Sequence, residues 1–244
     1  MLTTLWLISK IALIQVLRYG LLAGGAYLIV CKWGAHFFEK FRIQKLEITS
    51  AQIKHELKNS VITSLIFGFV FVLAVDPHIR PYTKIYNTLS SHPMWWNLLT
   101  LPYLILFNDA YFYWMHRAVH HKRIFKWVHH THHVSINPTP LASFSFHPLE
   151  AILESIWIVP LFFLVPLNFK LLIAYSLISF LNNIRGHLSV DLLPVHLKAR
   201  FPLNWINTSR HHSHHHKYFN TNYGLYFMFW DRWCGTERAE DKVS

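Results

Sequence analysis

Histidines recur at metal-binding spacing in the second half of this chain. His116 and His120 lie four residues apart, so on a helix their side chains share one face, one turn apart. Two imidazoles placed in this way offer two nitrogens to one metal ion. Two further groups, at 129–133 and 212–216, each contain histidines at i, i+3 and i+4, which we expect to share one helix face as well. The eight imidazoles are His116, His120, His129, His132, His133, His212, His215 and His216.

Three groups at this spacing indicate a site for two metal ions. Eight imidazoles exceed the roughly four to six ligands that one ion accepts, so two ions close together would share them. The chain holds 19 histidines against 12 Asp and Glu residues, and it lacks the Glu and Glu-x-x-His pairs of soluble di-iron bundles. Imidazole-rich ligation suits Fe, Zn, Cu or Ni. In the last group a second frame, His211, His214 and His215, also fits the spacing.

Two plainer explanations account for the histidines less well. The run 211–216 resembles an affinity tag, but Ser213 interrupts it and 28 further residues follow. Histidines also gather at membrane interfaces, where the polar tip of the ring reaches water. That explains isolated residues, but not three groups that each repeat a helical spacing.

The segments that must position these groups are strongly apolar. Hydrophobic residues make up 52% of the 244 residues and charged residues 14%, against roughly 25% charged in a soluble domain. Trp and Tyr cluster near the ends of the apolar stretches, as in an aromatic belt. Buried core helices of a soluble protein are the alternative, but the stretches show little polarity at the helical period. The stretches are Leu5–Val30, Val61–Val75, Trp95–Phe107, Ile152–Val165 and Phe169–Phe180.

Composition excludes several other classes of protein. Cys31 and Cys234 are the only cysteines, which excludes a disulfide-stapled domain, cysteine zinc fingers and iron–sulfur clusters. The net charge of +11 fits an anionic membrane face, and no finger, helix-turn-helix or RNP-like pattern points to nucleic acid. A cleaved signal peptide at 5–30 is disfavoured, because no charged segment precedes the apolar run.

Basic residues orient the predicted membrane helices. The segment 31–60 holds six Lys and Arg residues and should be cytoplasmic by the positive-inside rule. Val61–Val75 then crosses outward, Trp95–Phe107 returns, and 152–180 dips in as a hairpin with Pro166 near its tip. We therefore predict an all-α integral membrane protein with about four transmembrane helices, one hairpin among them. A cytoplasmic helical cap would hold the histidine-rich site for two metals, and the segments that flank the hairpin must share one membrane face.

The second half of the chain resembles the fatty acid hydroxylase and sterol desaturase superfamily of integral-membrane di-iron oxygenases. The resemblance covers residues 108–236, while 1–107 match only in being membrane-spanning. We expect one membrane-embedded domain, 1–244, made of an N-terminal transmembrane region and a catalytic region with these bounds. The matching stretches, in family order, are Asp109–His120, Trp127–His133, His147–Glu150, His212–His216, Asn222–Gly224 and Trp230–Thr236.

The resemblance implies a set of metal ligands. When the spacing of the family is counted back from residues 222–224, the ligands of the third group are His212, His215 and His216. His211 is then a neighbour of this group. It also implies His187, while a histidine that some relatives carry four residues earlier is replaced here by Asn183. The role of Asn183 stays open. The implied ligands are His116, His120, His129, His132, His133, His187, His212, His215 and His216.

Other residues could act from behind these ligands. A metal-bound imidazole usually gives its other N–H to a carboxylate or a carbonyl. Asp109 lies two helical turns before the first histidine on nearly the same face, and Glu150, Asp191 and Asp231 also lie near the groups. A solvated or interfacial role fits each acid equally. His147 could ligate directly, orient a neighbour or cap the hairpin that begins at Glu150.

The resemblance implies an oxidoreductase. Two ferrous ions, or zinc as the alternative occupant, would be bound, and iron with O2 would oxidise an unactivated C–H bond of a lipid. Hydroxylation and desaturation both stay open, as do sterol, fatty acyl, sphingoid, alkylglycerol and carotenoid substrates. No dinucleotide fingerprint or haem domain is apparent, so we expect a separate electron donor: a ferredoxin, a cytochrome b5-like protein or a reductase. Basic residues that could dock it, or contact lipid headgroups, are Arg117, Lys122, Arg123, Lys126, Arg210 and Lys217.

Two other functions would use the same residues. A membrane zinc hydrolase would activate water, but it normally needs a glutamate base nearby, as in HExxH, and no group contains one. A metal transporter or storage protein, which is not an enzyme, would carry ligands within its spans, whereas these groups lie between the predicted spans. Oxygen uptake with a reductant and a lipid would separate the oxygenase from both.

Overall fold

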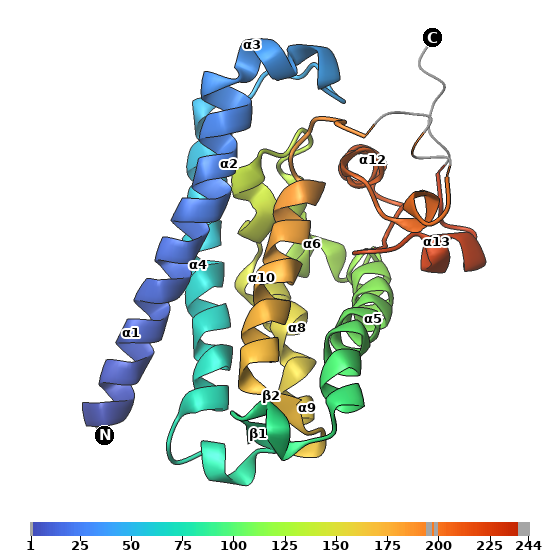
Figure 1. Ribbon diagram of the computed structural model, residues 1–244. Coiled ribbons are helices and arrows are strands. Elements are labelled where there is room, and N and C mark those ends of the chain that lie inside the picture. Colours follow the sequence, from blue (N-terminus) through green and yellow to red (C-terminus); the bar gives the residue numbers. More distant parts are fainter. Residues whose placement is uncertain (1, 194–196, 198–199, 239–244) are drawn as a thin grey trace.

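The computed structural model describes residues 2–193, 197 and 200–238, and most of the chain is helical. Helices α1, α4, α5, α8 and α10 form a bundle (Figure 1). Strands β1 (Ile85–Tyr86) and β2 (Leu167–Asn168) form a short parallel pair. The helices are α1 (Leu2–Tyr19), α2 (Gly25–Tyr27), α3 (Ala35–Phe38), α4 (Ser50–Val75), α5 (Met94–Val119), α6 (Phe125–Val128), α7 (His130–His133), α8 (Pro148–Ile156), α9 (Ile158–Leu164), α10 (Phe169–Gly186), α12 (Ser209–Tyr218) and α13 (Phe229–Trp233).

Two helical segments are long and apolar enough to cross a membrane. They are Thr4–Trp33, in which α1 and α2 are joined through π-helical turns, and Ser50–Val75. The 26 residues of α4 extend about 39 Å at 1.5 Å per residue, against about 30 Å for a hydrocarbon core. Large side chains such as Trp6, Leu17 and Phe69 are exposed on these helices. Among the described residues, the other three predicted stretches lie in helices that do not meet the same criteria of length and hydropathy.

Two helices extend well beyond the apolar stretches from which they were predicted. α4 begins before residue 61, and α5 ends after residue 107. α4 begins eleven residues earlier, at Ser50, because polar side chains in its first half find buried partners. Ser60 Oγ donates to Leu141 O at 2.9 Å, and the buried Glu56 accepts from Thr139. α5 continues twelve residues further, to Val119. Hydropathy marks the apolar surface of a helix, not its hydrogen-bonded length.

The histidine-bearing segments meet at one end of the bundle. α8 and α9 run away from that end, and α10 returns to it after a turn at β2 (Figure 1). The described residues of 120–147 and 187–236 therefore lie at the same end, as the hairpin requires. Beneath them, the rings of Phe144 and Phe180 stack with centroids 4.2 Å apart, and Tyr19 of α1 packs beside both. This core fixes the end of α10 against the N-terminal helix.

Candidate metal centre

Four parts of the chain bring nine histidines together. They are the end of α5, the short helices α6 and α7, the end of α10, and α12. The histidines form two groups, and within each group the candidate ligand atoms all lie within 4.8 Å of one another. The five-histidine group is His116, His120, His129, His133 and His215, and the four-histidine group is His132, His187, His212 and His216. These are the nine residues that the sequence singled out.

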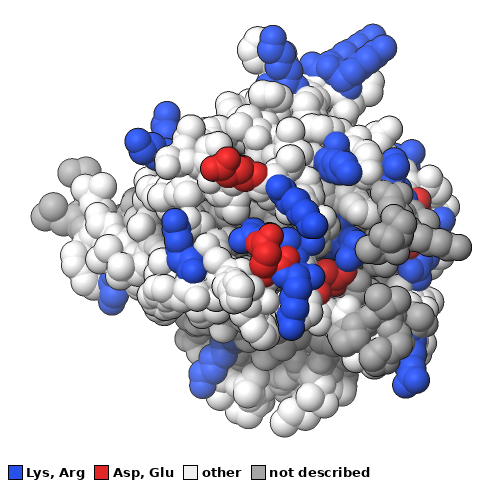
Figure 2. Space-filling model, turned by 90° about the horizontal axis from the view of Figure 1, so that it is seen from above, with Lys and Arg blue, Asp and Glu red and all other residues white. Residues whose placement is uncertain are grey.

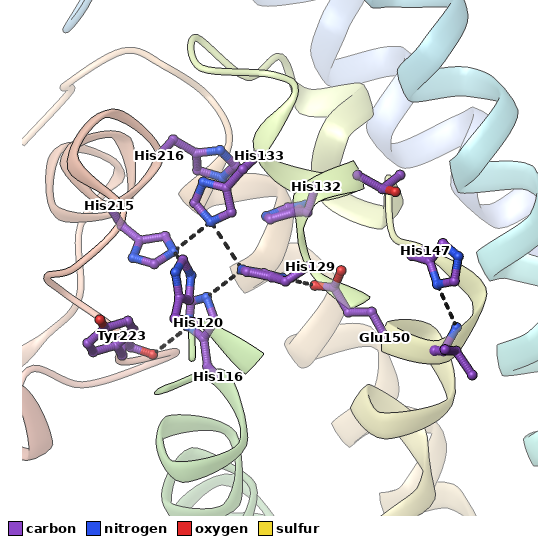
Figure 3. A network of polar contacts seen from close by, with 12 residues as sticks. His116, His120, His129, His132, His133, His147, Glu150, His215, His216 and Tyr223 are labelled. Carbon is purple, nitrogen blue, oxygen red and sulfur yellow. Dashed lines mark hydrogen bonds and ion pairs between the residues drawn. The ribbon is translucent and has the colours of Figure 1, made fainter. Parts of the chain in front are cut away.

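In the five-histidine group the Nε2 atoms face one another (Figure 3). Nε2 of His129 lies 3.1 Å from Nε2 of His116 and 3.1 Å from Nε2 of His133. Nε2 of His215 lies 3.0 Å from that of His133 and 3.1 Å from that of His120. Every ring of the group thus directs the same nitrogen towards a common centre.

The four-histidine group has the same arrangement. Nε2 of His212 lies 3.0 Å from Nε2 of His187 and 3.1 Å from Nε2 of His216. Nε2 of His132 lies 3.4 Å from that of His187. The rings of His133 and His216 are 4.8 Å apart between centroids, so the two groups adjoin.

Each His-x-x-His-His motif divides between the two groups, which corrects the expectation that its three histidines serve one face. His129 and His133 belong to the five-histidine group, and His132 lies in the other. In the third motif His215 is the residue that crosses to the five-histidine group. Residues i+3 and i+4 of a helix diverge by about 100°, so the motif can supply both groups. Each of the two motifs therefore contributes histidines to both groups.

Backbone carbonyls fix the protonation of three of these rings. A carbonyl oxygen only accepts, so Nδ1 of each ring must carry the hydrogen, and Nε2 then presents a lone pair to its group. The three contacts run from His116 Nδ1 to Tyr223 O at 2.9 Å, from His215 Nδ1 to Thr221 O at 2.7 Å, and from His187 Nδ1 to Asn183 O at 2.8 Å.

His129 has a carboxylate behind it. Oε1 of Glu150, on the first turn of α8, lies 2.5 Å from its Nδ1, and both residues are buried (Figure 3). A carboxylate in this position fixes the orientation of a ligating ring and raises its basicity. Of Asp109, Glu150 and Asp231, only Glu150 contacts a histidine of either group among the described residues.

Asp109 and Asp231 contact backbone instead. Asp231 accepts from the N–H groups of Tyr223 and Gly224, each at 2.8 Å. Asp109 accepts from two N–H groups further along the same loop, at 2.7 and 3.2 Å. Both acids are buried. They hold the loop whose carbonyl at Tyr223 orients the ring of His116.

The other residues considered from the sequence take capping and bridging positions. His147 lies outside both groups and caps α8 by accepting a backbone N–H of the first turn (Figure 3). His211 forms a capping box with Thr208 at the start of α12. The side-chain amide of Asn183 donates to a backbone carbonyl at 2.7 Å, and the backbone carbonyl of Asn183 accepts from His187.

Burial keeps these imidazoles neutral. It lowers the pKa of His116 and of His187 to about 4. For the other seven rings burial is again the largest cause of a lowered pKa, and neighbouring rings lower it further. The neutral ring is the form that binds a metal ion. Burial also raises the pKa of Glu150.

The donor set fits metal ions. His116 and His215 carry their hydrogen on Nδ1, so both direct an Nε2 lone pair into the five-histidine group, and two such lone pairs repel unless a cation lies among them. Nitrogens about 3.0 Å apart are also what two ligands at right angles would show, given metal–nitrogen bonds of about 2.1 Å. Nine neutral nitrogens and one carboxylate behind them suit two divalent ions of a nitrogen-preferring metal.

One cavity adjoins the histidines, and a second shares part of its wall. The histidine cavity has an empty volume of about 450 Å³ and is lined by residues of both groups. The apolar chamber, about 960 Å³ including the part that opens outward, lies among α1, α4, α8, α9 and α10. Four residues line both cavities: Phe146, Glu154, Asn183 and Leu225.

Three of these four residues were missed from the sequence. Phe146 and Leu225 are single apolar residues outside any metal-binding spacing, so they carry no signal. Glu154 carries a weak one, as an acid inside the apolar stretch Ile152–Val165. The ring of Phe146 lies 5.0 Å from that of His132 between centroids, which places the boundary between the cavities next to the four-histidine group.

Comparison with known proteins places residues 101–236 in the sequence model of the fatty acid hydroxylase family. The chain is 35% identical over 238 residues to a Delta(7)-sterol 5(6)-desaturase of Leptosphaeria maculans, which covers 96% of this chain and 62% of that protein. It is 31% identical over 188 residues to one of Gibberella zeae, covering 77% and 57%. It is 29% identical over 220 residues to the lathosterol oxidase of Homo sapiens, covering 87% and 71%.

The chain spans about six tenths of the length of the first two of these relatives. No solved structure matches it.

Proposed function

Because the chain belongs to the fatty acid hydroxylase and sterol desaturase superfamily, we propose that it is an O2-dependent di-iron oxidoreductase that hydroxylates or desaturates a lipid. One observation carries the proposal: two groups of histidines, seven of the nine buried, converge beside an apolar chamber. Relatives named as Delta(7)-sterol 5(6)-desaturases and lathosterol oxidase make a Δ7-sterol the first lipid to test.

The two histidine groups would each hold one iron ion. Bound iron would supply the reduction of O2 and the oxidation of an unactivated C–H bond. The chain would supply ligation and the orientation of the rings, through Glu150 and the carbonyls behind them. The chamber, whose lining includes six Phe side chains, would hold the lipid and exclude water from the reacting carbon. A positioned substrate accounts for much of the rate of such a reaction.

A separate protein would deliver the electrons. Basic side chains are spread over the end of the molecule above the histidines, with acidic ones among them (Figure 2). Arg117, Lys122, Lys126 and Lys217 are exposed, and they would dock an acidic electron carrier. Arg210 takes a different role, because its guanidinium pairs with Asp191 at 2.7 Å.

We further propose the topology to which the sequence points: about four transmembrane helices, with the histidine groups on the cytoplasmic face. Residues 1–107 would form the N-terminal transmembrane region and 108–236 the catalytic region of one domain. Two observations support this: two segments qualify as spans by length and hydropathy, and the histidine-bearing segments share one end of the bundle (Figure 1).

The function is tested on purified protein in lipid nanodiscs. We expect about two iron ions per chain by elemental analysis, and O2 uptake with a ferredoxin or cytochrome b5 system and a Δ7-sterol. His132→Ala should abolish iron loading and oxidation without affecting membrane insertion. The matched control is His130→Ala, because His130 is exposed in the same segment and lies outside both groups. Two-iron protein that consumes no O2 with any donor and lipid would contradict the proposal.

A further inference from the structure

One acidic side chain lies at the boundary between the two cavities. Glu154 is on α8, one turn beyond Glu150, and lines both the histidine cavity and the apolar chamber. Residues i and i+4 share a helix face, so the carboxylate that contacts His129 and the one at the boundary follow each other along α8. Among the described residues, Glu154 forms no hydrogen bond and no ion pair.

The open surface of Glu154 faces the cavities. Glu154 is half-buried, and it lines both the histidine cavity and the apolar chamber. A carboxylate in an apolar enclosure without a donor is costly, so we expect a ligand to supply one.

The chamber as a whole favours a neutral donor. Arg18 of α1 also lines it, where its guanidinium donates to Ser176 Oγ at 2.7 Å. Ser176 lies seven residues before Asn183 on α10, about 10 Å along the helix axis, so this positive charge is on the same wall but away from the boundary. An ammonium group would add a second positive charge to a chamber that already holds the Arg18 guanidinium, so a neutral O–H group fits better.

From these contacts we propose that Glu154 accepts a hydrogen bond from the hydroxyl group of a lipid alcohol whose apolar part lies in the chamber. The hydroxyl would lie at the boundary beside Phe146, and carbons a few bonds away would reach the histidine cavity. Glu154 is then a residue that determines specificity: it selects alcohols and sets which carbon is presented. This inference rests on the proposed function, because it assigns the substrate class of that site.

The experiment compares alcohols with their methyl ethers. Equilibrium binding to the iron-loaded protein in nanodiscs is measured for a Δ7-sterol and its 3-methyl ether, and for octadecanol and its methyl ether. We expect at least one alcohol to bind roughly tenfold more tightly than its ether, because the ether leaves a buried acceptor without a donor. Glu154→Leu should abolish this preference and Glu154→Gln should retain part of it. Glu47→Leu, at an exposed acid outside both cavities, should leave it intact.

Iron content serves as the check that each variant is folded, since Glu154 lies outside both histidine groups. An unchanged preference in Glu154→Leu, equal binding of alcohol and ether by the wild type, or binding of no probe at all would overturn the inference. Lipid oxidation is measured on the same samples. Oxidation without an alcohol preference rejects the role of Glu154 alone, and an alcohol preference without oxidation of any lipid rejects the proposed function alone.

Discussion

The two histidine groups are held in different ways by the protein around them. In the five-histidine group, His116 and His215 donate to backbone carbonyls and His129 contacts the carboxylate of Glu150. In the four-histidine group only His187 has an Nδ1 donating to a carbonyl within normal geometry. The Nδ1 of His216 is buried without a partner among the described residues, and that of His132 faces the Ser145 backbone without a hydrogen bond of normal geometry.

This difference separates two sources of ring orientation. Hydrogen bonds from behind orient most of the five-histidine group before any ion binds, and they leave the Nε2 lone pairs converging. The four-histidine group has one ligand fewer and depends more on the ion itself to align its rings. We therefore expect a tightly held metal in the first group, and in the second a more labile metal with more room for other ligands.

Removing one ligand from each group should show the difference most clearly. His187→Ala takes away one of four nitrogens and the one firmly oriented ring, so we expect about one metal ion per chain instead of two. Activity should fall by more than the roughly 100-fold seen when a supporting partner of a metal ligand is lost. His120→Ala leaves four nitrogens in its group and should keep nearly two ions. Elemental analysis after desalting measures both, and a larger metal loss in His120→Ala would refute the comparison.

Glu150→Gln tests the carboxylate alone. The amide oxygen can still accept from His129 Nδ1, but the negative charge behind the ring is lost. We expect the affinity of the five-histidine group to fall about 10–100-fold, with little change in the four-histidine group. Competition against a metal indicator resolves the two affinities. Glu47→Gln, at an exposed position, is the control. An equal fall in the metal affinity of both groups would mean that Glu150 does not act specifically on the five-histidine group.

Metal removal by a chelator should occur in two phases. The four-histidine group should lose its ion several-fold faster, because fewer of its rings are held from behind. At the same chelator concentration, the slow phase should be faster in Glu150→Gln than in the wild type. Stopped-flow absorbance with an iron chelator follows both phases. Loss of both ions in a single phase would mean that the two groups hold their metal equally firmly.

The spacing of the imidazoles is a local property, so the sequence could indicate which histidines would gather, while His187 was implied by the family resemblance alone. His116 and His120 are one turn apart on any helix, and the later motifs repeat the same geometry. All nine residues meet in the structure. The division of each motif between two groups was not predictable, since it depends on how α7 and α12 are placed against α5 and α10, which only tertiary packing determines.

The surroundings of the site could be predicted less well. Glu150 was one of four acids that the sequence could not rank, and only the position of the start of α8 beside His129 distinguishes it from Asp109 and Asp231. The chamber is built from single residues of several helices, and no sequence period marks such a set. Helix ends were misplaced for a related reason: the buried partners of Glu56 lie in another segment.

Asp231→Asn should have the smallest effect, because Asp231 acts on the five-histidine group through a loop. Its carboxylate accepts from Tyr223 N, Gly224 N and Thr236 Oγ1 at 2.7–2.8 Å, and an asparagine leaves one of these donors unsatisfied. A buried unpaired group costs about 1–3 kcal/mol, so thermal unfolding should shift downward measurably. The Tyr223 carbonyl behind His116 would be held less firmly, and the metal affinity of the five-histidine group should fall only a few-fold. A loss as large as that of Glu150→Gln would mean that loop position, rather than the carboxylate behind His129, controls how firmly this group holds its ion.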